Sequence, residues 1–483
     1  MRATFRLTLL LSLAALAAPP IAGVLAAQRP DSLSAEVRRY VTIDAPVVAL
    51  TRVTVIDGTG AAAKSDQTIV IRDGKIAEVG PAARVLIPAG AHVVELPGHT
   101  VIPGLVGMHD HLFYTAAGGR ASQMSYTAPR LYLASGVTTI RTTGGRAPYA
   151  EINTKEAVDN GQIPGPRVHL TAPYLTGSAG GGSMAVVESP EAARRFVAYW
   201  GSEGATWLKA YTDIRAADLG AAIDEAHKRG MKVTGHLCSV SFQEAVALGI
   251  DNLEHGMLTA SDFDPDRTPD ICTPANITPV RVGTADPAGS VAQAMIRKMV
   301  ERSVSMTSTL VIYELFVAGR EQPDDRTLAA MSPEVRGAYL AVRHQIDSTG
   351  RGMVSVEALR NAMAFDRAFV AAGGLLGAGV DPTGLGGALP GFGDQRNYEL
   401  FIEAGFTPAQ AVQIMSANGA KILGVYDSLG SVEPGKLADL VVLAGDLTAD
   451  PGVIRNATTV FKDGIGYDSA RLIAAVKGRV GID

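Results

Sequence analysis

Residues 103–111 read Pro-Gly-Leu-Val-Gly-Met-His-Asp-His, an apolar run that ends in two histidines separated by one residue. A run of this kind favours a strand that is buried on both faces, as in a parallel sheet. Side chains alternate along a strand, so His109 and His111 project to one side while Asp110 points away. Two imidazoles on one face can share a metal ion.

Further apolar runs follow, and stretches with helical patterns separate them. The expected strands are Val101–Met108, Val137–Arg141, Arg167–Ala172, Thr206–Ala210, Lys232–Gly235, Asn252–Glu254, Val304–Thr309 and Leu375–Val380. Alternating strands and helices indicate an α/β fold with a parallel sheet, and eight such units predict a (β/α)8 TIM barrel. An open doubly wound sheet is the alternative, because a sequence does not show the order of the strands.

Signals for helix ends support this interpretation. A serine or threonine at the N-cap, with Glu or Gln three residues later, marks a helix start, and glycine marks an end. The signals are Ser189-Pro190, Ser241 with Glu244, Thr407 with Gln410, and Gly230 at the end of a helix from about Ala217.

Short β-rich runs bracket the chain at both ends, such as Val53–Ile56 near the start and Ala438–Leu443 near the end. They predict a small β-sandwich domain built from both chain ends. The expected organisation is a signal peptide at 1–27, the N-terminal part of the sandwich at 28–103, the barrel at 104–425 and the C-terminal part of the sandwich at 426–483.

The first 27 residues have a basic start, a leucine-rich run and small residues at the end, as in a secretory signal. We therefore expect a periplasmic or secreted protein with no membrane contact after signal removal. An uncleaved membrane anchor is the alternative, which Pro19-Pro20 disfavours. The formal net charge of −5 gives no basic surface for nucleic acid. An oxidising compartment would permit Cys238 and Cys272 to pair, but the sequence leaves this open.

Four histidines stand at or just past the ends of expected strands, and barrel enzymes build their sites at that end. They are His109, His111, His236 and His255. Each alone would be interpreted as a hydrogen-bonded structural residue, but four at one end favour a metal site. Asp381 follows the eighth strand, with a turn aspartate before Pro382 as the alternative. Lys209 ends the fourth strand in an apolar setting, where it forms either a buried ion pair or an anionic carbamate.

This ordered set resembles the amidohydrolase superfamily, in the subgroup around Xaa-Pro dipeptidases and imidazolonepropionase-like proteins. The resemblance runs from about Val47 to about Lys462. The matching pieces are residues 103–111, Lys209, His236, Asn252-Leu-Glu-His255-Gly256, Asp381, Thr407-Pro408, residues 418–420, Leu423-Gly424 and residues 430–439.

The resemblance implies two divalent metal ions. One is held by His109, His111 and Asp381, and the other by His236 and His255, with a CO2-derived carbamate on Lys209 as the bridge. Zinc is the expected ion, although Mn and Co accept the same ligands. A metal-bridging hydroxide would attack an amide bond, peptide-like or in an N-acyl amino acid, with Asp381 as general acid and base.

Two other functions stay open at this point. A lactonase or esterase would use the same two-metal site, and a non-catalytic envelope protein could bind metal or solute. Candidate substrate contacts are Tyr114, Arg141 and Tyr211, and packing or capping roles are the alternative for each. The long segments at about 257–300 and 313–370 would lie over the catalytic face of the barrel. The sequence identifies neither the exact small-molecule substrate nor whether the chain forms a homo-oligomer.

Overall fold

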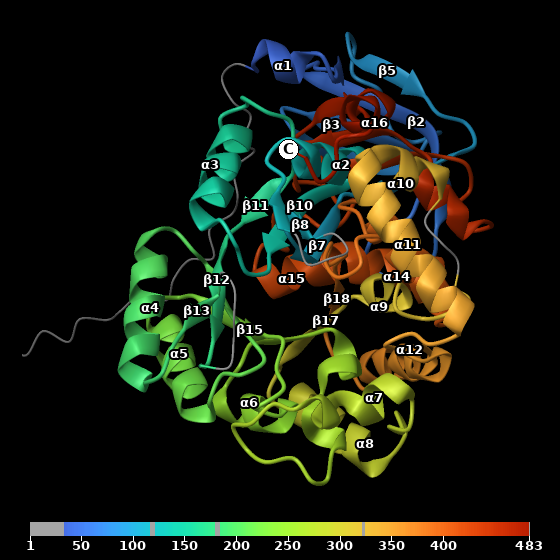
Figure 1. Cartoon of the computed structure of the whole chain (residues 1–483). Coiled ribbons are helices and arrows are strands. Elements are labelled where there is room, and N and C mark those ends of the chain that lie inside the picture. Colours follow the sequence, from blue (N-terminus) through green and yellow to red (C-terminus); the bar gives the residue numbers. More distant parts are fainter. Residues whose placement is uncertain (1–32, 116–120, 179–183, 321–323, 483) are drawn as a thin grey trace, which may run out of the picture.

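Figure 1 shows a computed structural model of the chain, which describes residues 33–115, 121–178, 184–320 and 324–482. The expected signal peptide at 1–27 lies outside the described residues. No helix within the described ranges has both the length and the apolar character needed to cross a membrane.

The centre of the molecule is a sheet in which all pairings are parallel. Its strands are β7 (Leu105–Asp110), β10 (Val137–Thr142), β11 (Arg167–His169), β12 (Thr171–Thr176), β13 (Ala185–Val186), β14 (Trp207–Ala210), β15 (Lys232–Gly235), β16 (Asn252–Glu254), β17 (Ser305–Ser308) and β18 (Leu376–Ala378). The order is β11-β10-β7-β18-β17-β16-β15-β14-β12-β13.

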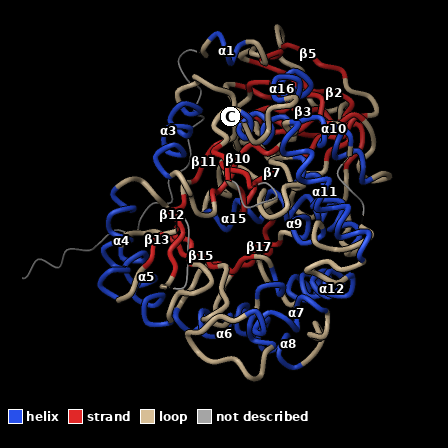
Figure 2. The backbone as a smooth tube through the Cα atoms, in the orientation of Figure 1, coloured by secondary structure: helices blue, strands red, loops and turns tan. Residues whose placement is uncertain are grey.

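Only Leu170 separates β11 from β12 in the chain, and these two strands lie at or near the two ends of the strand order. The order of paired strands therefore begins and nearly ends in the same segment of the chain. Figure 2 shows strands of this sheet near the middle of the molecule and, towards the outside, helices such as α4 (Pro190–Ser202), α5 (Ala216–Lys228), α6 (Phe242–Leu248), α8 (Ser290–Glu301) and α12 (Val356–Ala371). The fold is therefore a TIM-barrel-like α/β arrangement.

Two expected strands differ from the structure. Val101–Met108 is divided, because its first residues belong to β6 (His99–Pro103), which pairs with a different sheet. The division falls at Gly104, where a Cβ atom would lie 2.1 Å from Oγ1 of Thr138. Only glycine allows this close approach of the chain as it passes between the sheets. Arg167–Ala172 is likewise interrupted at Leu170.

The helices of the structure are α1 (Ala35–Arg38), α2 (Thr127–Ala134), α3 (Pro148–Asp159), α4 (Pro190–Ser202), α5 (Ala216–Lys228), α6 (Phe242–Leu248), α7 (Thr278–Val282), α8 (Ser290–Glu301), α9 (Leu310–Glu314), α10 (Asp325–Ala330), α11 (Pro333–Thr349), α12 (Val356–Ala371), α13 (Phe392–Glu403), α14 (Pro408–Gln413), α15 (Gly419–Leu423) and α16 (Ser469–Val476). The expected caps are confirmed. Ser189 caps α4, and the boxes begun by Ser241 and Thr407 open α6 and α14.

Strands from both ends of the chain pair in one nine-stranded sheet. They are β1 (Val41–Ile43), β2 (Val47–Val55), β3 (Lys64–Arg72), β4 (Lys75–Pro81), β5 (His92–Glu95), β6, β19 (Leu440–Ala444), β20 (Ala457–Lys462) and β21 (Ile465–Asp468). In Figure 1 the blue N-terminal strands and the red C-terminal elements lie together at the top. The pairing of β6 with β19 joins the two ends.

The main apolar core lies between the parallel strands and their helices and includes Ile140, Leu208 and Ile223. A second core, with Val48 and Phe461, belongs to the nine-stranded sheet. Each fully buried side chain of this size stabilises the fold by about 1.5–3 kcal/mol. The cores hold the strand ends, and with them the polar residues that follow, in fixed positions.

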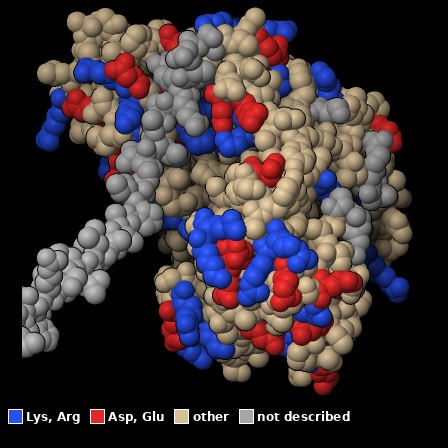
Figure 3. Space-filling model, turned by 90° about the vertical axis from the view of Figure 1, so that its left-hand side faces the viewer, with Lys and Arg blue, Asp and Glu red and all other residues tan. Residues whose placement is uncertain are grey.

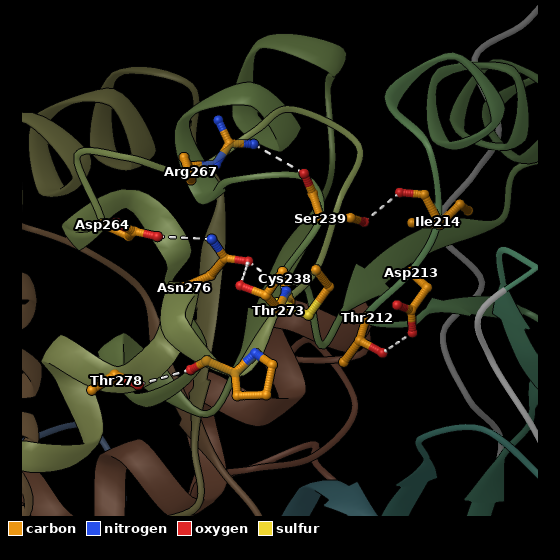
Figure 4. Close-up of a disulfide and its surroundings, with 12 residues drawn as sticks. Thr212, Asp213, Ile214, Cys238, Ser239, Asp264, Arg267, Thr273, Asn276 and Thr278 are labelled. Carbon is orange, nitrogen blue, oxygen red and sulfur yellow. Dashed lines mark hydrogen bonds between the residues drawn. A yellow bond between two sulfur atoms is a disulfide. The ribbon is translucent and has the colours of Figure 1, made fainter.

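Two long connections follow β16 and β17. The first contains three short 3-10 segments, Gly256–Thr259, Ser261–Phe263 and Pro274–Ile277, before α7 and α8. Cys238 and Cys272 form a disulfide with a Cα–Cα distance of 5.3 Å, which ties this connection to the segment after β15 (Figure 4). Ser239 reinforces the junction, because its hydroxyl donates to the Ile214 carbonyl and its own carbonyl accepts from Arg267.

On the face drawn in Figure 3, Lys and Arg side chains stand among Asp and Glu side chains instead of forming a patch of one sign. The absence of nucleic-acid binding remains a prediction that rests on the net charge of the chain.

Candidate metal centre

The predicted ligands stand at the carboxyl ends of the parallel strands. His109 is in β7, Lys209 is in β14, and His236 and His255 directly follow β15 and β16. Parallel strands end at one edge of a sheet, so these side chains converge. An open cavity of about 340 Å³ is lined by five of them, His109, His111, Lys209, His236 and Asp381. The His255 ring packs 4.4 Å, centroid to centroid, from both His109 and His236.

The tightest group consists of His109, His255 and Asp381, whose ligand atoms all lie within 4.8 Å of one another. The Asp381 carboxylate is central to it. Its Oδ2 lies 3.7 Å from His109 Nε2, and its Oδ1 lies 3.4 Å from His111 Nε2. His236 and Lys209 lie on the same cavity wall but outside this tight group.

Three of the histidines have their Nδ1 atoms held by the protein. His109 Nδ1 lies 2.7 Å from Glu254 Oε2, and His111 Nδ1 lies 3.2 Å from the Gly144 carbonyl. His255 Nδ1 lies 2.8 Å from Thr309 Oγ1. A carboxylate or carbonyl oxygen at Nδ1 fixes the rings of His109 and His111 and leaves their lone pairs at Nε2, as in metal-ligating histidines. In His255 the Nδ1 atom also lies 3.8 Å from Oδ2 of Asp381.

The backbone at two of these residues is left-handed. His255 has φ 70° and Asp381 has φ 46°, a region that residues other than glycine rarely adopt. Such conformations cost of order 1–3 kcal/mol and persist where the surroundings enforce them. For Asp381 the surroundings include two hydrogen bonds, from its own N–H to the His109 carbonyl and from Thr383 Oγ1 to its Oδ1. The carboxylate is therefore aimed by the backbone.

Lys209 is fully buried, and its Nζ has no hydrogen-bond partner among the described residues. Burial lowers the pKa of this ammonium to about 8. The Nε2 atom of His255 is likewise buried and without a partner in the described part of the chain. Orphaned polar atoms are rare in protein interiors and call for a bound group. The residues present thus fit a divalent cation.

The electrostatics keep the histidines neutral and the aspartate charged. Burial, helped by the neighbouring Lys209, lowers the pKa of His236 to about 3. Burial also holds the pKa of His255 well below its ordinary value. For Asp381 burial opposes ionisation, but His109 and His111 hold its pKa below the ordinary value. Neutral imidazoles and a carboxylate are the forms that bind metal.

Two of the expected substrate contacts do not reach the cavity. Tyr114 is buried, and its hydroxyl donates to the Gly386 carbonyl. Arg141 is fully buried and donates to Glu254 Oε1 at 2.5 Å. Tyr211 does line the cavity, beside Tyr174, with ring centroids 5.2 Å apart.

Glu254 contacts the predicted ligand His109, and the sequence-based predictions did not include it. The sequence did contain a signal for such a contact, because a carboxylate in a buried strand is costly unless a partner neutralises it. Its partners are Arg141 on one oxygen and His109 on the other. Other missed residues of the cavity wall are Arg146, Tyr174, Arg281, Tyr313 and Met353. The last three come from the long connections, in which no local pattern marks them.

The sequence matches the model of the amidohydrolase family over residues 100–264 and 361–466, more than half of the chain. The chain therefore belongs to the amidohydrolase family. It is a hydrolase that acts on carbon–nitrogen bonds, as the sequence predicted.

Three individual proteins that resemble this chain share 20–25% of its residues. A dihydroorotase from Pelotomaculum thermopropionicum is 25% identical over 405 residues, covering 79% of this chain and 86% of the relative. The crystal structure of a putative prolidase from Bifidobacterium longum has a TM-score of 0.62 at 25% identity, covering 89% of this chain and 98% of that one. A Xaa-Pro dipeptidase with bound methionine has a TM-score of 0.64 at 20% identity, covering 87% and 100%, respectively.

Proposed function

We propose that this chain hydrolyses a peptide-like amide bond or the amide of an N-acyl amino acid with the help of two divalent metal ions, zinc as the expected metal. His109, His111 and Asp381 would hold one ion, and His236 and His255 the other. The observation that carries the proposal is the convergence of His109, His111 and His255 on the Asp381 carboxylate, whose oxygens lie 3.7, 3.4 and 3.8 Å, respectively, from a ring nitrogen of each. The names of the prolidase and dipeptidase relatives agree with this bond type.

A carbamate on Lys209 is the proposed bridge between the two ions. The buried Nζ faces the cavity without a partner among the described residues, which leaves room for a further group. Attack of the neutral amine on CO2 forms the N–C bond and releases one proton. The product is an anion that offers two oxygens, whereas an ammonium has no lone pair to offer a metal.

Divalent ions at these ligands would lower the pKa of water towards neutrality and polarise the scissile carbonyl. Asp381 would accept the proton of the attacking water and deliver it to the leaving nitrogen. The Tyr211 hydroxyl would orient the carbonyl group. The lowered pKa of Asp381 means that the carboxylate is ionised at neutral pH, which is the form that binds a metal ion.

The finer architecture belongs to the same proposal. We infer a closed eight-stranded barrel, a β-sandwich in the nine-stranded sheet, and domain limits at 28–103, 104–425 and 426–483. The pairing of β18 with β7 supports closure. A signal peptide at 1–27 and a periplasmic or secreted location rest on the sequence.

The test is a comparison of metal-loaded and chelator-treated protein on two substrate panels, one of N-acyl amino acids and dipeptides and one of lactones. We expect chelator-sensitive amide hydrolysis and about two equivalents of metal by elemental analysis. Turnover of lactones alone would favour the esterase function. Metal-loaded protein that turns over neither panel would contradict the proposal.

A further inference from the structure

The wall of the metal-site cavity carries more positive than negative charge. Three basic side chains, Arg146, Lys209 and Arg281, line it, but Asp381 is the one carboxylate among its described lining residues. The proposed reaction assigns roles to Lys209 and Asp381, but it assigns none to Arg146 and Arg281. A guanidinium that faces a ligand cavity is suited to carboxylates, which it binds through paired N–H donors.

Arg281 has no carboxylate partner in the described part of the chain. Its Nη1 lies 3.1 Å from the Met353 sulfur, a weak acceptor, and its Nε is buried without a partner. Elsewhere the protein pairs its half-buried arginines with acids, as for Arg396 with Glu314 and Arg267 with Glu244. Among the described residues, Arg281 and Arg146 of the cavity wall both lack an acidic partner, so such a partner can arrive with the substrate.

The backbone around Arg281 is fixed by contacts between the two long connections. The Arg281 carbonyl accepts from the Ser355 N–H at 2.9 Å. Asn361 in α12 donates to the carbonyls of Gly283 and Ala285, both at 3.0 Å. The arginine therefore stands on a backbone that is already ordered, which lowers the entropic cost of binding a ligand.

Arg146 also has a buried Nε without a partner among the described residues, but its guanidinium packs 5.4 Å from the centre of the Phe113 ring, which makes it less suited to this role. Apolar side chains fill much of the remaining wall, among them Phe113, Ile312 and Phe316. The cavity thus offers an apolar surface together with a cation that has no acidic partner among the described residues. A substrate that matches both features has a carboxylate and an apolar side chain.

We propose that Arg281 binds a free carboxylate of the substrate, so that the enzyme selects amides of amino acids with apolar side chains over neutral amides. This inference rests on the proposed function for its substrate class, whereas the carboxylate site itself can be tested without turnover. Arg281 would act as a specificity-determining residue contributed by the connection after β16.

The first experiment measures binding to chelator-treated protein by calorimetry. The probes are N-acetyl-L-phenylalanine and N-acetylphenethylamine, which differ only in the carboxylate. We expect the wild type to bind the carboxylate compound about 10- to 100-fold more tightly, and Arg281→Met to abolish this preference. Arg281→Lys should retain part of it. Arg297→Met, at an exposed position of α8, is the matched control and should behave as the wild type.

The inference is overturned if the wild type binds both probes equally or neither at millimolar concentration. It is also overturned if Arg281→Met keeps the preference, including the case in which Arg146→Met loses it instead. Circular dichroism of each variant checks that the fold is intact.

The second experiment repeats the comparison as hydrolysis by metal-loaded protein. We expect kcat/KM for the carboxylate substrate to fall about 10- to 100-fold in Arg281→Met, with the neutral amide unaffected. If the binding preference is present but neither compound is hydrolysed, the proposed function fails for these amides and the carboxylate site stands. Equal hydrolysis of both compounds by the wild type would count against the site.

Discussion

Nδ1 of His109 lies 2.7 Å from Oε2 of Glu254, while the other oxygen of this carboxylate accepts from Arg141. The guanidinium of Arg141 in turn lies 4.4 Å from the centre of the Trp207 ring. Burial opposes the charge on Glu254, but Arg141 and Lys209 hold its pKa below the ordinary value. The buried carboxylate of Glu254 therefore orients the ring of His109, a proposed metal ligand, through the ring nitrogen that would not bind the metal.

Replacing Glu254 by Gln should weaken metal binding about 10- to 100-fold, because the ring of His109 loses its charged acceptor. Loss of the ion pair with Arg141 should also lower the free energy of unfolding by about 3–5 kcal/mol. Elemental analysis after dialysis and urea unfolding measure the two effects. Glu78→Gln, at an exposed position, is the control. Equal metal retention in both variants would remove Glu254 from this role.

Replacing Asp381 by Asn should lower kcat at least about 100-fold and leave KM nearly unchanged, because the amide cannot accept the proton of the attacking water. Steady-state kinetics on the best amide substrate measure this split. Asp427→Asn, at an exposed position, should match the wild type. An unchanged kcat would exclude Asp381 as the general acid and base.

Glu151 in α3 predicts a pH dependence of stability. Burial raises the pKa of its carboxyl to about 8, against an ordinary value near 4.5, so the folded chain holds a proton that the unfolded chain releases. Its contribution is fully present below about pH 4.5 and is lost as the pH rises through about 8. Glu151→Gln should therefore gain stability relative to the wild type between about pH 5 and 8, by up to about 4 kcal/mol.

Urea unfolding of both proteins at the two pH values measures this change. Glu156→Gln is the matched control, because Glu156 is an exposed residue of the same helix. A difference between wild type and Glu151→Gln that does not vary with pH would show that Glu151 is already ionised in the folded protein.

The disulfide should stabilise the connection after β16. The cysteines are 34 residues apart, and closing a loop of this length removes about 4 kcal/mol of chain entropy from the unfolded state. Cys272→Ser and reduction of the wild type should both lower the free energy of unfolding by up to this amount. Reduction should leave Cys272→Ser unchanged. Equal stability of the oxidised and reduced wild type would contradict the expectation.

The sequence determined much of the fold, because strand and helix signals are local. The alternation around His109 and His111, the apolar runs and the caps at Ser189, Ser241 and Thr407 depend on near neighbours in the chain. The order of residues at strand ends, from His109 to Asp381, also indicated where the polar side chains would meet. The break at Gly104 escaped prediction, because its cause is a contact with Thr138 from another strand.

Tertiary structure alone decided which side chains reach the cavity. Tyr114 and Arg141 looked suitable in the sequence, but packing directs them into the protein interior. Arg281 and Met353 come from connections without a distinctive pattern, and the contact between those connections brings them to the site. Periodicity and propensity act over a few residues, whereas such contacts join positions far apart in the chain, so their geometry follows only from the folded backbone.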